Sequence, residues 1–429
     1  MDSTVGIGIL GAGTVGGPLI RRLVEDRASI AMKTGLDLEV KRVAVADIAK
    51  PRPFEVAEGV LTENARDVID DPGVYLVVEV MGGEDPAGDL ILGALDGGKP
   101  VVTANKALIA ARGPELIAAA ERSGVPLLFE ASVGGGIPII RPLTETLAGE
   151  HIERVLGIVN GTTNYILTAM ADDGHTYLDA LEAAQSLGFA EADPTADVSG
   201  ADAAAKAAIL ASLAFGTWVG IGDVYHEGIQ DLSSVDLAFA ADLGYVVKLL
   251  AVAARSEAGI CARVHPVMLP LDHPLAAIRG ATNAIFIEGP AINELLFAGP
   301  GAGGEPTATA VLGDIIDAAR EILAGAQVAP RIQFSPGELI PFGEVTTKVY
   351  IRLEVDDRPG VLAQIAGEFG KADVSIKSVR QQGEGSEATL LIVTHRAPEA
   401  RQQLAIKALT GLAPVRHVAS VIRVESAEA

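Results

Sequence analysis

The chain concentrates its chemically useful side chains in one short segment, residues 188–206. That segment holds a set of carboxylates: Glu191, Asp193, Asp197 and Asp202. It leads into an apolar helix on which Lys206 lies one turn after Asp202 and is the only charged residue from 203 to 222. Burial penalises the charged ammonium, so a lysine on such a helix becomes a tunable acid or base. The segment is therefore typical of a proton-transfer site.

The same residues also have a purely structural interpretation. Ser199 and Asp202 fit a capping box at the start of the helix. Asp202 and Lys206 have the spacing of an ordinary helical ion pair, which stabilises by only about 0.2–0.5 kcal/mol. Lys206 could also extend its amine out of a buried helix. Taken alone, this segment favours the structural interpretation over proton transfer. The rest of the chain reverses that preference.

The composition restricts the class of partner. The chain has 429 residues, enough for two or three domains, and 56 acidic against 33 basic residues give it a formal net charge of -23. Such a surface repels nucleic acid and anionic lipid, so we expect a small-molecule ligand, no nucleic acid and no membrane. The single cysteine, Cys261, excludes an intramolecular disulfide and fits the cytoplasm. The first residues read as a strand rather than a signal peptide, and the uncharged run 207–221 is too short to span a bilayer.

A dinucleotide-binding fingerprint lies near the start of the chain. A strand expected at 5–10 leads into the sequence Gly11-Ala12-Gly13-Thr14-Val15-Gly16, and a helix follows to about residue 27. Gly11 permits the tight turn, Gly13 lets a pyrophosphate approach the backbone, and Gly16 lets the helix pack on the strand. Free amides at the helix N-terminus then face the phosphates. The flanking strand and helix strengthen a motif that alone is weak.

The next strand, expected at 38–46, leaves the choice of dinucleotide open. It ends at Asp47, which is either the ribose ligand or a turn residue. Lys50 and Arg52 could instead meet a 2′-phosphate. The residues therefore do not decide between NAD and NADP.

Further strands and helices alternate up to residue 130. We expect strands at 75–80, 101–102 and 125–130 and helices at 86–95 and 107–122, which together predict a parallel sheet covered on both faces. Ligands bind such sheets beyond the carboxyl ends of the strands. Gly82, Thr103 and Lys106 fall on that edge, where a ligand role for Lys106 is favoured over a plain surface lysine.

Two further glycine-rich segments allow more than one interpretation. Residues 130–138 combine Glu130 with three consecutive glycines. The main-chain carbonyls of these glycines could bind an alkali or alkaline-earth ion together with the Glu130 carboxylate, or the segment could be an interdomain hinge. Residues 299–307 open a helix running to about 323, which is either a second site of close ligand approach or a tight connection. Between them the pattern is less regular. We expect a strand from 155 that ends in a polar turn at 160–164, helices at 165–172 and 178–187, and a loop at 290–300.

The tail, residues 349–424, has the order βαββαβ of a ferredoxin-like unit. Its expected strands lie at 349–355, 374–381, 387–394 and 418–424, with helices at 361–370 and 398–409 and a hairpin at 383–386. The proline-rich stretch 330–347 reads as a linker. His395 and His417 are isolated and are interpreted as structural.

These motifs, taken in order, resemble homoserine dehydrogenase in its long bacterial form with a C-terminal ACT domain. The resemblance spans nearly the whole chain and is carried by VEVMGG (78–83), GKPVVTANKALIA (98–110), FEASVGGGIPII (129–140), NGTTNYIL (160–167), GFAEADPTADVSGADAAAK (188–206), PGAGGEPTATAVLGD (300–314) and DRPGVLA (357–363). It implies that L-homoserine and L-aspartate 4-semialdehyde are interconverted with NAD(P), as part of threonine and methionine synthesis. A basic residue common in relatives is replaced here by Ala46, which puts a strict NADP preference in doubt.

The resemblance also implies roles for individual residues. Lys206 would be the general acid/base, Asp202 and Glu191 would hold the substrate together with Gly161 and Thr162, and Lys106 would bind or relay a proton. The dinucleotide would contact Gly11, Gly13, Thr14, Val15, Gly16, Gly82, Thr103, Lys106 and Gly303. A monovalent cation, Na⁺ or K⁺, would be bound through Glu130, Val133, Gly135 and Ile137.

The expected architecture is an α/β chain of three parts. Residues 1–130 would form the dinucleotide-binding domain, completed by about 305–328, and 131–304 a substrate-binding, catalytic and dimerisation domain. A linker at 329–348 would precede the ACT domain at 349–429. ACT domains bind amino acids, so threonine is an expected effector, and a homodimer or homotetramer is expected.

Two other classes of function remain open at this point. A nucleotide-sensing regulatory protein would use the first domain and the tail but leave Lys206 without a catalytic role. A dehydrogenase for 2-hydroxy acids would need a His–carboxylate pair, and none of the 7 histidines has a suitable strand-end motif. The enzyme interpretation predicts loss of homoserine oxidation at low pH, as Lys206 becomes protonated.

Overall fold

The computed structural model describes residues 4–325, 332–383 and 388–425. The chain forms two compact units, each assembled from separate stretches of sequence. The first unit contains the chain up to His151, residues 208–221 and residues 297–336. The second contains 152–207, 222–296 and the chain from Gly337 onward. In the described part of the chain, no helix is long and apolar enough to cross a membrane.

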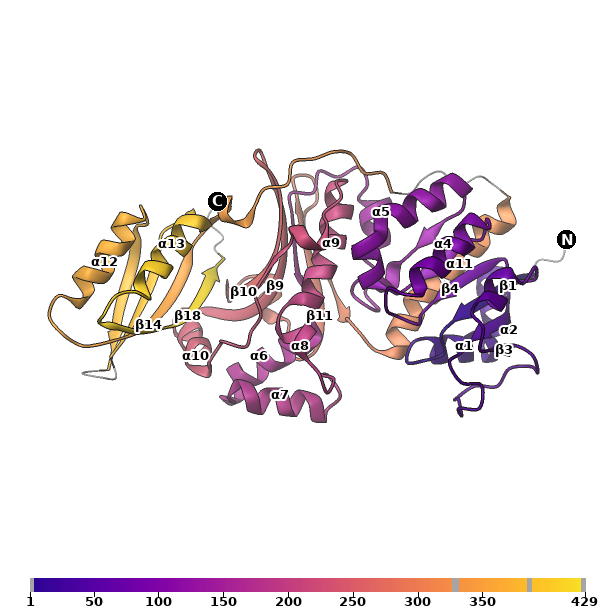
Figure 1. Ribbon diagram of the computed structural model, residues 1–429, viewed down its shortest axis with the longest axis horizontal. Coiled ribbons are helices and arrows are strands. Elements are labelled where there is room, and N and C mark those ends of the chain that lie inside the picture. The colour runs from indigo at the N-terminus through magenta and orange to yellow at the C-terminus, as the bar shows by residue number, and fades with distance from the viewer. Residues whose placement is uncertain (1–3, 326–331, 384–387, 426–429) are drawn as a thin grey trace. The chain divides into compact units, whose positions relative to one another are not determined.

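The first unit is built on a six-stranded parallel sheet with the strand order β3-β2-β1-β4-β5-β6. Figure 1 labels β1, β3 and β4 of this sheet. Its strands are β1 (Thr4–Leu10), β2 (Asp37–Ala44), β3 (Leu61–Thr62), β4 (Leu76–Glu79), β5 (Val101–Thr103) and β6 (Leu127–Leu128). The connecting helices are α1 (Gly16–Glu25), α2 (Arg27–Thr34), α3 (Arg66–Asp70), α4 (Ala87–Asp96) and α5 (Lys106–Ser123). The strand order reverses beside β1, so the carboxyl ends of β1 and β4 flank the crevice where such sheets bind ligands.

The predicted doubly wound parallel sheet is thus confirmed, with two additions. The sequence analysis did not include β3 and α3, which are only two and five residues long. Such short elements carry too few residues for a hydrophobic period to emerge. The strand expected at 125–130 is reduced to β6, because Glu130 already begins the 3₁₀ turn Glu130–Ser132.

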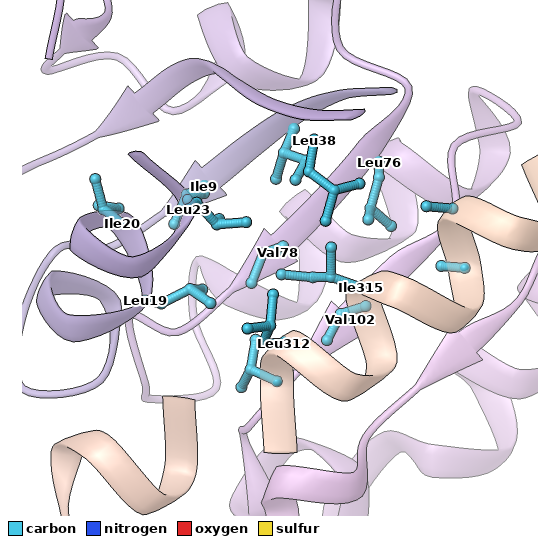
Figure 2. Close-up of a cluster of buried hydrophobic side chains, with 14 of the residues drawn as sticks. Ile9, Leu19, Ile20, Leu23, Leu38, Leu76, Val78, Val102, Leu312 and Ile315 are labelled. Atoms are coloured by element: carbon cyan, nitrogen blue, oxygen red, sulfur yellow. The ribbon is translucent and has the colours of Figure 1, made fainter. Parts of the chain in front are cut away.

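A late helix, α11 (Gly304–Ala324), packs into the core of this first sheet. Figure 2 shows Leu312 and Ile315 from this helix against Val78 of β4 and Val102 of β5. All four side chains are at most 5% exposed, and each such side chain contributes roughly 1.5–3 kcal/mol of hydrophobic stabilisation. The helix therefore belongs to the first unit although it lies some 170 residues after β6 in the sequence (304 against 128).

The second unit is built on a mixed sheet dominated by a long hairpin. Strands β9 (Tyr245–Ser256) and β10 (Gly259–Pro270) pair along their whole length, from Ser256 with Gly259 to Tyr245 with Pro270. The other strands of this part are β7 (Arg154–Ile158), β8 (Tyr225–His226) and β11 (Thr282–Gly289), and its helices are α6 (Gly161–Asp173), α7 (Tyr177–Ser186), α8 (Thr195–Val198) and α10 (Ser234–Asp242). Two elements begin in this unit and end in residues of the first: helix α9 (Ala201–Phe215), from residue 208, and strand β12 (Asn293–Pro300), from residue 297.

Two expectations for this region are wrong. Residues 293–300 form β12 rather than a loop. β12 is a largely exposed edge strand, so the Gly-Pro pairs before it (289–290) and at its end (299–300) dominated the sequence signal. The segment 161–164 is the first turn of α6 rather than a polar turn before a helix at 165, because Asn160 caps the helix with its side chain. Gly161 and Thr162 are therefore helical residues.

The tail has the predicted βαββαβ order, and its strands continue the sheet of the second unit. The elements are β14 (Val349–Val355), α12 (Val361–Lys371), β15 (Ile376–Gln382), β16 (Thr389–Thr394), α13 (Glu399–Leu409) and β18 (Val415–Val424), with β13 (Thr346–Thr347) paired to β17 (Ala397–Pro398). The strand order is β18-β14-β16-β15, and β18 pairs in parallel with β10 (Figure 1). The tail thus has its own core, while its strands β18, β14, β16 and β15 extend the sheet of the second unit and β13 and β17 form a small sheet of their own. The expected hairpin at 383–386 and part of the expected linker fall outside the described residues.

Candidate active site

Lys206 is buried and paired, as its apolar helix predicts. The side chain leaves α9 with its Nζ donating to the Asp202 carboxylate and to the main-chain oxygen of Val159, both at 2.7 Å. The residue is 9% exposed. Because its charge is held by a carboxylate and a carbonyl away from bulk water, the amine has a fixed direction. The amine does not extend into solvent as a snorkelling lysine would, and the pair with Asp202 is the i,i+4 ion pair that the spacing predicts.

Asn160 holds the acidic side of the cluster together. Its side-chain oxygen caps α6 by accepting from the amide of Thr163 at 2.9 Å. Its amide group donates to Asp197 at 2.7 Å and to Asp202 at 2.9 Å. Burial raises the pKa of Asp197, and the Asp202 charge adds to that effect while the hydrogen bond from Asn160 opposes it. The sequence analysis assigned no role to Asn160, although asparagine is one of the preferred residues at a helix N-cap.

The first turn of α6 closes the other side of the cluster. Thr162 donates its hydroxyl to the main-chain oxygen of Phe189 at 2.5 Å, which fixes the segment before α8. A Cβ on Gly161 would lie 2.7 Å from the main-chain oxygen of Ala281, so only glycine fits there. Because Asn160 is the N-cap of α6, the carboxylates to which it donates lie near the positive N-terminal end of that helix.

Glu191 lies apart from this cluster in the described contacts. It is exposed on the stretch between α7 and α8, and its main-chain oxygen accepts from Gln185 at 3.1 Å. Asp193 is used locally, accepting from the amide and hydroxyl of Thr195. Of the predicted acids, Asp197 and Asp202 are thus the ones brought to Lys206.

The glycine fingerprint of the first unit forms an open cradle. Gly11 has φ +103, and a Cβ there would lie 2.8 Å from the main-chain oxygen of Val80. A Cβ on Gly16 would lie 2.2 Å from the oxygen of Gly11. At Gly13, by contrast, nothing lies within 4 Å of a Cβ position, which leaves space for a pyrophosphate. Thr14 and Val15 complete the loop and lead into α1.

A buried glutamate shapes the neighbouring loop after β4. Glu79 is fully buried and accepts from the amides of Met81 and Gly82 at 2.8 and 3.0 Å. Its second oxygen accepts from the Thr103 hydroxyl at 2.6 Å. Gly82 has φ +74 and open space at its Cβ position. The Thr103 hydroxyl is therefore used inside the protein, and a dinucleotide contact would fall to its main chain.

Lys106 lies at the start of α5 in the first unit. Asn105 caps this helix by accepting from the amide of Leu108 and donates to the main-chain oxygen of Gly83 at 2.6 Å. Lys106 is half-buried at the first helical position. The Asn105 side chain thereby joins the loops after β4 and β5. These loops lie at the edge of the sheet where the sequence predicts a ligand-binding site.

The three glycine-rich segments converge within the first unit. A Cβ on Gly135 would lie 2.5 Å from the main-chain oxygen of Gly301, and one on Gly304 would lie 2.3 Å from that of Thr14. Gly303, with φ +112, precedes the first turn of α11. The loop at 301–304 thus lies against both the fingerprint and the 134–136 loop. The sequence analysis did not predict that Gly304 packs against the main chain of Thr14.

The carboxylate of Glu130 is committed to main-chain amides. It accepts from Ile139, Ile140 and Arg141 at 2.6–2.8 Å, while its own amide donates to Asp314. Burial raises the pKa of Asp314 to about 7. Because the Glu130 carboxylate already accepts these hydrogen bonds, a cation near Val133, Gly135 and Ile137 would be bound mainly by main-chain carbonyl oxygens of the loop. The described residues contain no group of three His, Cys, Asp or Glu placed to hold a metal ion.

The end of β2 carries the residues that bear on dinucleotide choice. Asp47 accepts from the amide of Ala49 at 2.8 Å, as a turn residue does. The guanidinium of Arg52 donates to the main-chain oxygens of Ile48 and Lys50. Lys50 and Arg52 line a hollow of about 340 Å³ together with Phe54 and Leu61.

Comparison with known proteins covers most of the chain. Residues 11–130 match the profile of the NAD-binding domain of homoserine dehydrogenase, 138–316 that of homoserine dehydrogenase itself, and 349–413 that of the ACT domain. Homoserine dehydrogenase of Corynebacterium glutamicum is 46% identical over 99% of this chain and 96% of its own. A crystal structure of the enzyme from Thiobacillus denitrificans matches with a TM-score of 0.92 and 40% identity over 99% of this chain and 98% of that one.

A more distant relative is described with its dinucleotide. A hyperthermophilic archaeal homoserine dehydrogenase in complex with NADPH matches 74% of this chain and 98% of its own, at 30% identity and a TM-score of 0.61. The profiles, the long relatives and the shared fold agree on one assignment. The chain belongs to the homoserine dehydrogenase family of oxidoreductases, which act on a CH–OH group, in the form that carries an ACT domain.

Proposed function

We propose that the chain interconverts L-homoserine and L-aspartate 4-semialdehyde with NAD or NADP, and that Lys206 is its general acid/base. The buried Lys206–Asp202 pair carries this proposal, because it holds one amine in a fixed direction beside a cluster of acids. The dinucleotide cradle of the first unit supplies the second requirement. Family membership supports the substrate.

In this proposal Lys206 exchanges the proton of the substrate oxygen. In the oxidation direction its neutral amine takes the hydroxyl proton while hydride leaves the same carbon for the dinucleotide, and in reduction its ammonium returns the proton. Asp202 and the Val159 carbonyl orient the amine. Lys106 binds substrate or relays a proton.

Substrate binding falls to the residues around α6 and α8. Gly161 and Thr162 lie in the first turn of α6, where the helix dipole favours a carboxylate ligand, and Asp202 lies in the first turn of α9. Glu191 is exposed and carries the charge that an ammonium group needs. We therefore assign it to the amino group of the substrate.

The dinucleotide is held by Gly11, Gly13, Gly82 and Gly303. The open space at Gly13 and Gly82 supports that role. Both NAD and NADP remain candidates. The guanidinium of Arg52 beside the 340 Å³ hollow favours a 2′-phosphate, as does the NADPH complex of the archaeal relative.

Three further assignments complete the proposal. A Na⁺ or K⁺ ion binds through carbonyls of the loop that contains Glu130, Val133, Gly135 and Ile137. Threonine acts on the ACT domain as a feedback effector in threonine and methionine synthesis. The enzyme works in the cytoplasm as a homodimer or homotetramer.

A spectrophotometric assay with homoserine tests these points together. It is run separately with NAD⁺ and NADP⁺, with and without threonine, and in K⁺, Na⁺ or choline salts. We expect homoserine-dependent reduction of at least one dinucleotide. Absence of turnover with either dinucleotide would rule out the proposed reaction.

A further inference from the structure

A buried arginine of the tail is bonded to the catalytic part of the second unit. Arg423, on β18, is 5% exposed, and its guanidinium donates to Glu399 of α13 at 2.5 and 3.2 Å. The same guanidinium donates to Glu227, which lies just after β8. It also lies over the rings of Phe342 and Tyr225, 5.3 and 5.9 Å from their centres. One side chain thus joins the ACT strand to a loop outside the ACT domain.

Glu227 is held from several directions, so the bond to Arg423 fixes more than one side chain. Its second carboxylate oxygen accepts from the Tyr225 hydroxyl, and its amide donates to the main-chain oxygen of Val264 at 2.8 Å. Burial and the Glu227 charge raise the pKa of Tyr225, which keeps that hydroxyl a donor. The backbone at 227 therefore has one position relative to β10.

The loop that follows Glu227 lies directly on the turn that begins the catalytic helix. The amide of Ile229 donates to the main-chain oxygen of Val198 at 2.9 Å. A Cβ on Gly228 would lie 2.1 Å from that same oxygen, and one on Gly200 would lie 2.8 Å from the oxygen of Glu227. Backbone meets backbone here without any intervening side chain, so a shift of 227–229 must move 198–200.

That turn sets the position of the reacting groups. Gly200 accepts from the amide of Ala204 at 2.8 Å in the first turn of α9, and Asp202 lies inside that turn. Lys206 follows one turn later and is bonded to Asp202. We propose that Arg423 and Glu227 are positioning residues that fix the start of α9, so that the ACT domain sets the placement of Asp202 and Lys206. This inference rests on the catalytic role proposed for Lys206.

The chain offers a matched control for this contact. Arg352, on β14 of the same ACT domain, forms a second buried ion pair with the catalytic part, to Asp236 at 2.7 Å, and donates a hydrogen bond to the Ser233 hydroxyl at 3.1 Å. Those partners lie at the start of α10. Breaking the Arg352 contact removes an ACT attachment of the same kind without touching residues 198–200.

The test compares Glu227→Ala, Arg423→Gln, their double variant, Arg423→Lys and Arg352→Gln in the full chain. Glu227→Ala is the gentler change, because it leaves the buried Arg423–Glu399 pair in place. We measure kcat and KM for homoserine, NADPH affinity by fluorescence titration, and thermal midpoints. Lys206→Met is assayed in parallel.

We expect Glu227→Ala and Arg423→Gln each to lower kcat/KM for homoserine by about tenfold, since small displacements of reacting groups are costly. NADPH affinity should stay within about twofold, and the double variant should lose little beyond the larger single loss, because both changes break one link. Arg423→Lys should recover part of the loss, and Arg352→Gln should keep kcat/KM within about twofold at a similar thermal midpoint.

Two outcomes overturn the inference. One is unchanged kcat/KM in Glu227→Ala and Arg423→Gln, and the other is an equal loss in Arg352→Gln, which would indicate general loosening. If either occurs while Lys206→Met is inactive, only the positioning role fails. Retained turnover in Lys206→Met would instead remove the catalytic role proposed for Lys206, on which this inference rests.

Discussion

Two buried lysines of the second unit show how a partner decides what a lysine can do. Lys206 donates to the Asp202 carboxylate, whereas Lys248 on β9, 2% exposed, donates to the side-chain oxygen of Asn164 at 2.9 Å and to the main-chain oxygen of Ile278 at 2.5 Å. Both acceptors of Lys248 are neutral, and burial lowers its pKa to about 8. Lys248 therefore holds the first turn of α6 in place through Asn164, whereas Lys206 is paired with an acidic side chain, Asp202.

This difference predicts a pH-dependent stability that belongs to Lys248. Its pKa falls from 10.5 to about 8 on folding, so the unfolded chain binds more protons between those pH values and stability rises with pH across that window. Lys248→Met should lack this contribution, which amounts to about 3 kcal/mol between pH 8 and pH 10.5. Urea denaturation of both proteins across that range measures it, and parallel curves would contradict the assignment.

At the scale of elements, the glycine cradle separates packing from ligand space. Gly16 and Gly13 lie three residues apart in one loop, yet a Cβ would clash with Gly11 at the first position and meet nothing at the second. The roles of these glycines were predictable because they depend on a local turn. Glu79 was not predictable as a loop organiser, because its partners come from the loop after β4 and from β5, and a single buried acid in a strand does not reveal them.

The paired substitutions Gly13→Ala and Gly16→Ala test this separation. Gly13→Ala should keep its thermal midpoint and lose dinucleotide affinity, because the methyl group occupies space meant for the pyrophosphate. Gly16→Ala should be destabilised by about 1–3 kcal/mol, as overpacking commonly is. Thermal melts and fluorescence titration with NADPH distinguish them, and equal effects of the two changes on both readouts would refute the cradle.

At the scale of the whole molecule, each compact unit carries one half of the proposed chemistry. The first holds the glycine cradle and Lys106, and the second holds Asp202 and Lys206. The sequence predicted the parallel sheet and the tail from local periodicity. It did not predict the long β9–β10 hairpin or the edge strand β12, whose partners are set by the sheet rather than by their own residues. Nor could it show that 301–304 meets Thr14, a contact between segments nearly 290 positions apart (304 against 14).

Because the two halves lie in different units, turnover and dinucleotide binding should be separable by substitution. The most direct measurement compares Lys206→Met with Lys248→Met, a second buried lysine of the same unit, for homoserine turnover and NADPH affinity. Lys206→Met should lose about 10³-fold in kcat with NADPH affinity unchanged, while Lys248→Met should stay within about tenfold of the parent. Turnover by Lys206→Met near the parent rate would contradict the central claim that this amine moves the substrate proton.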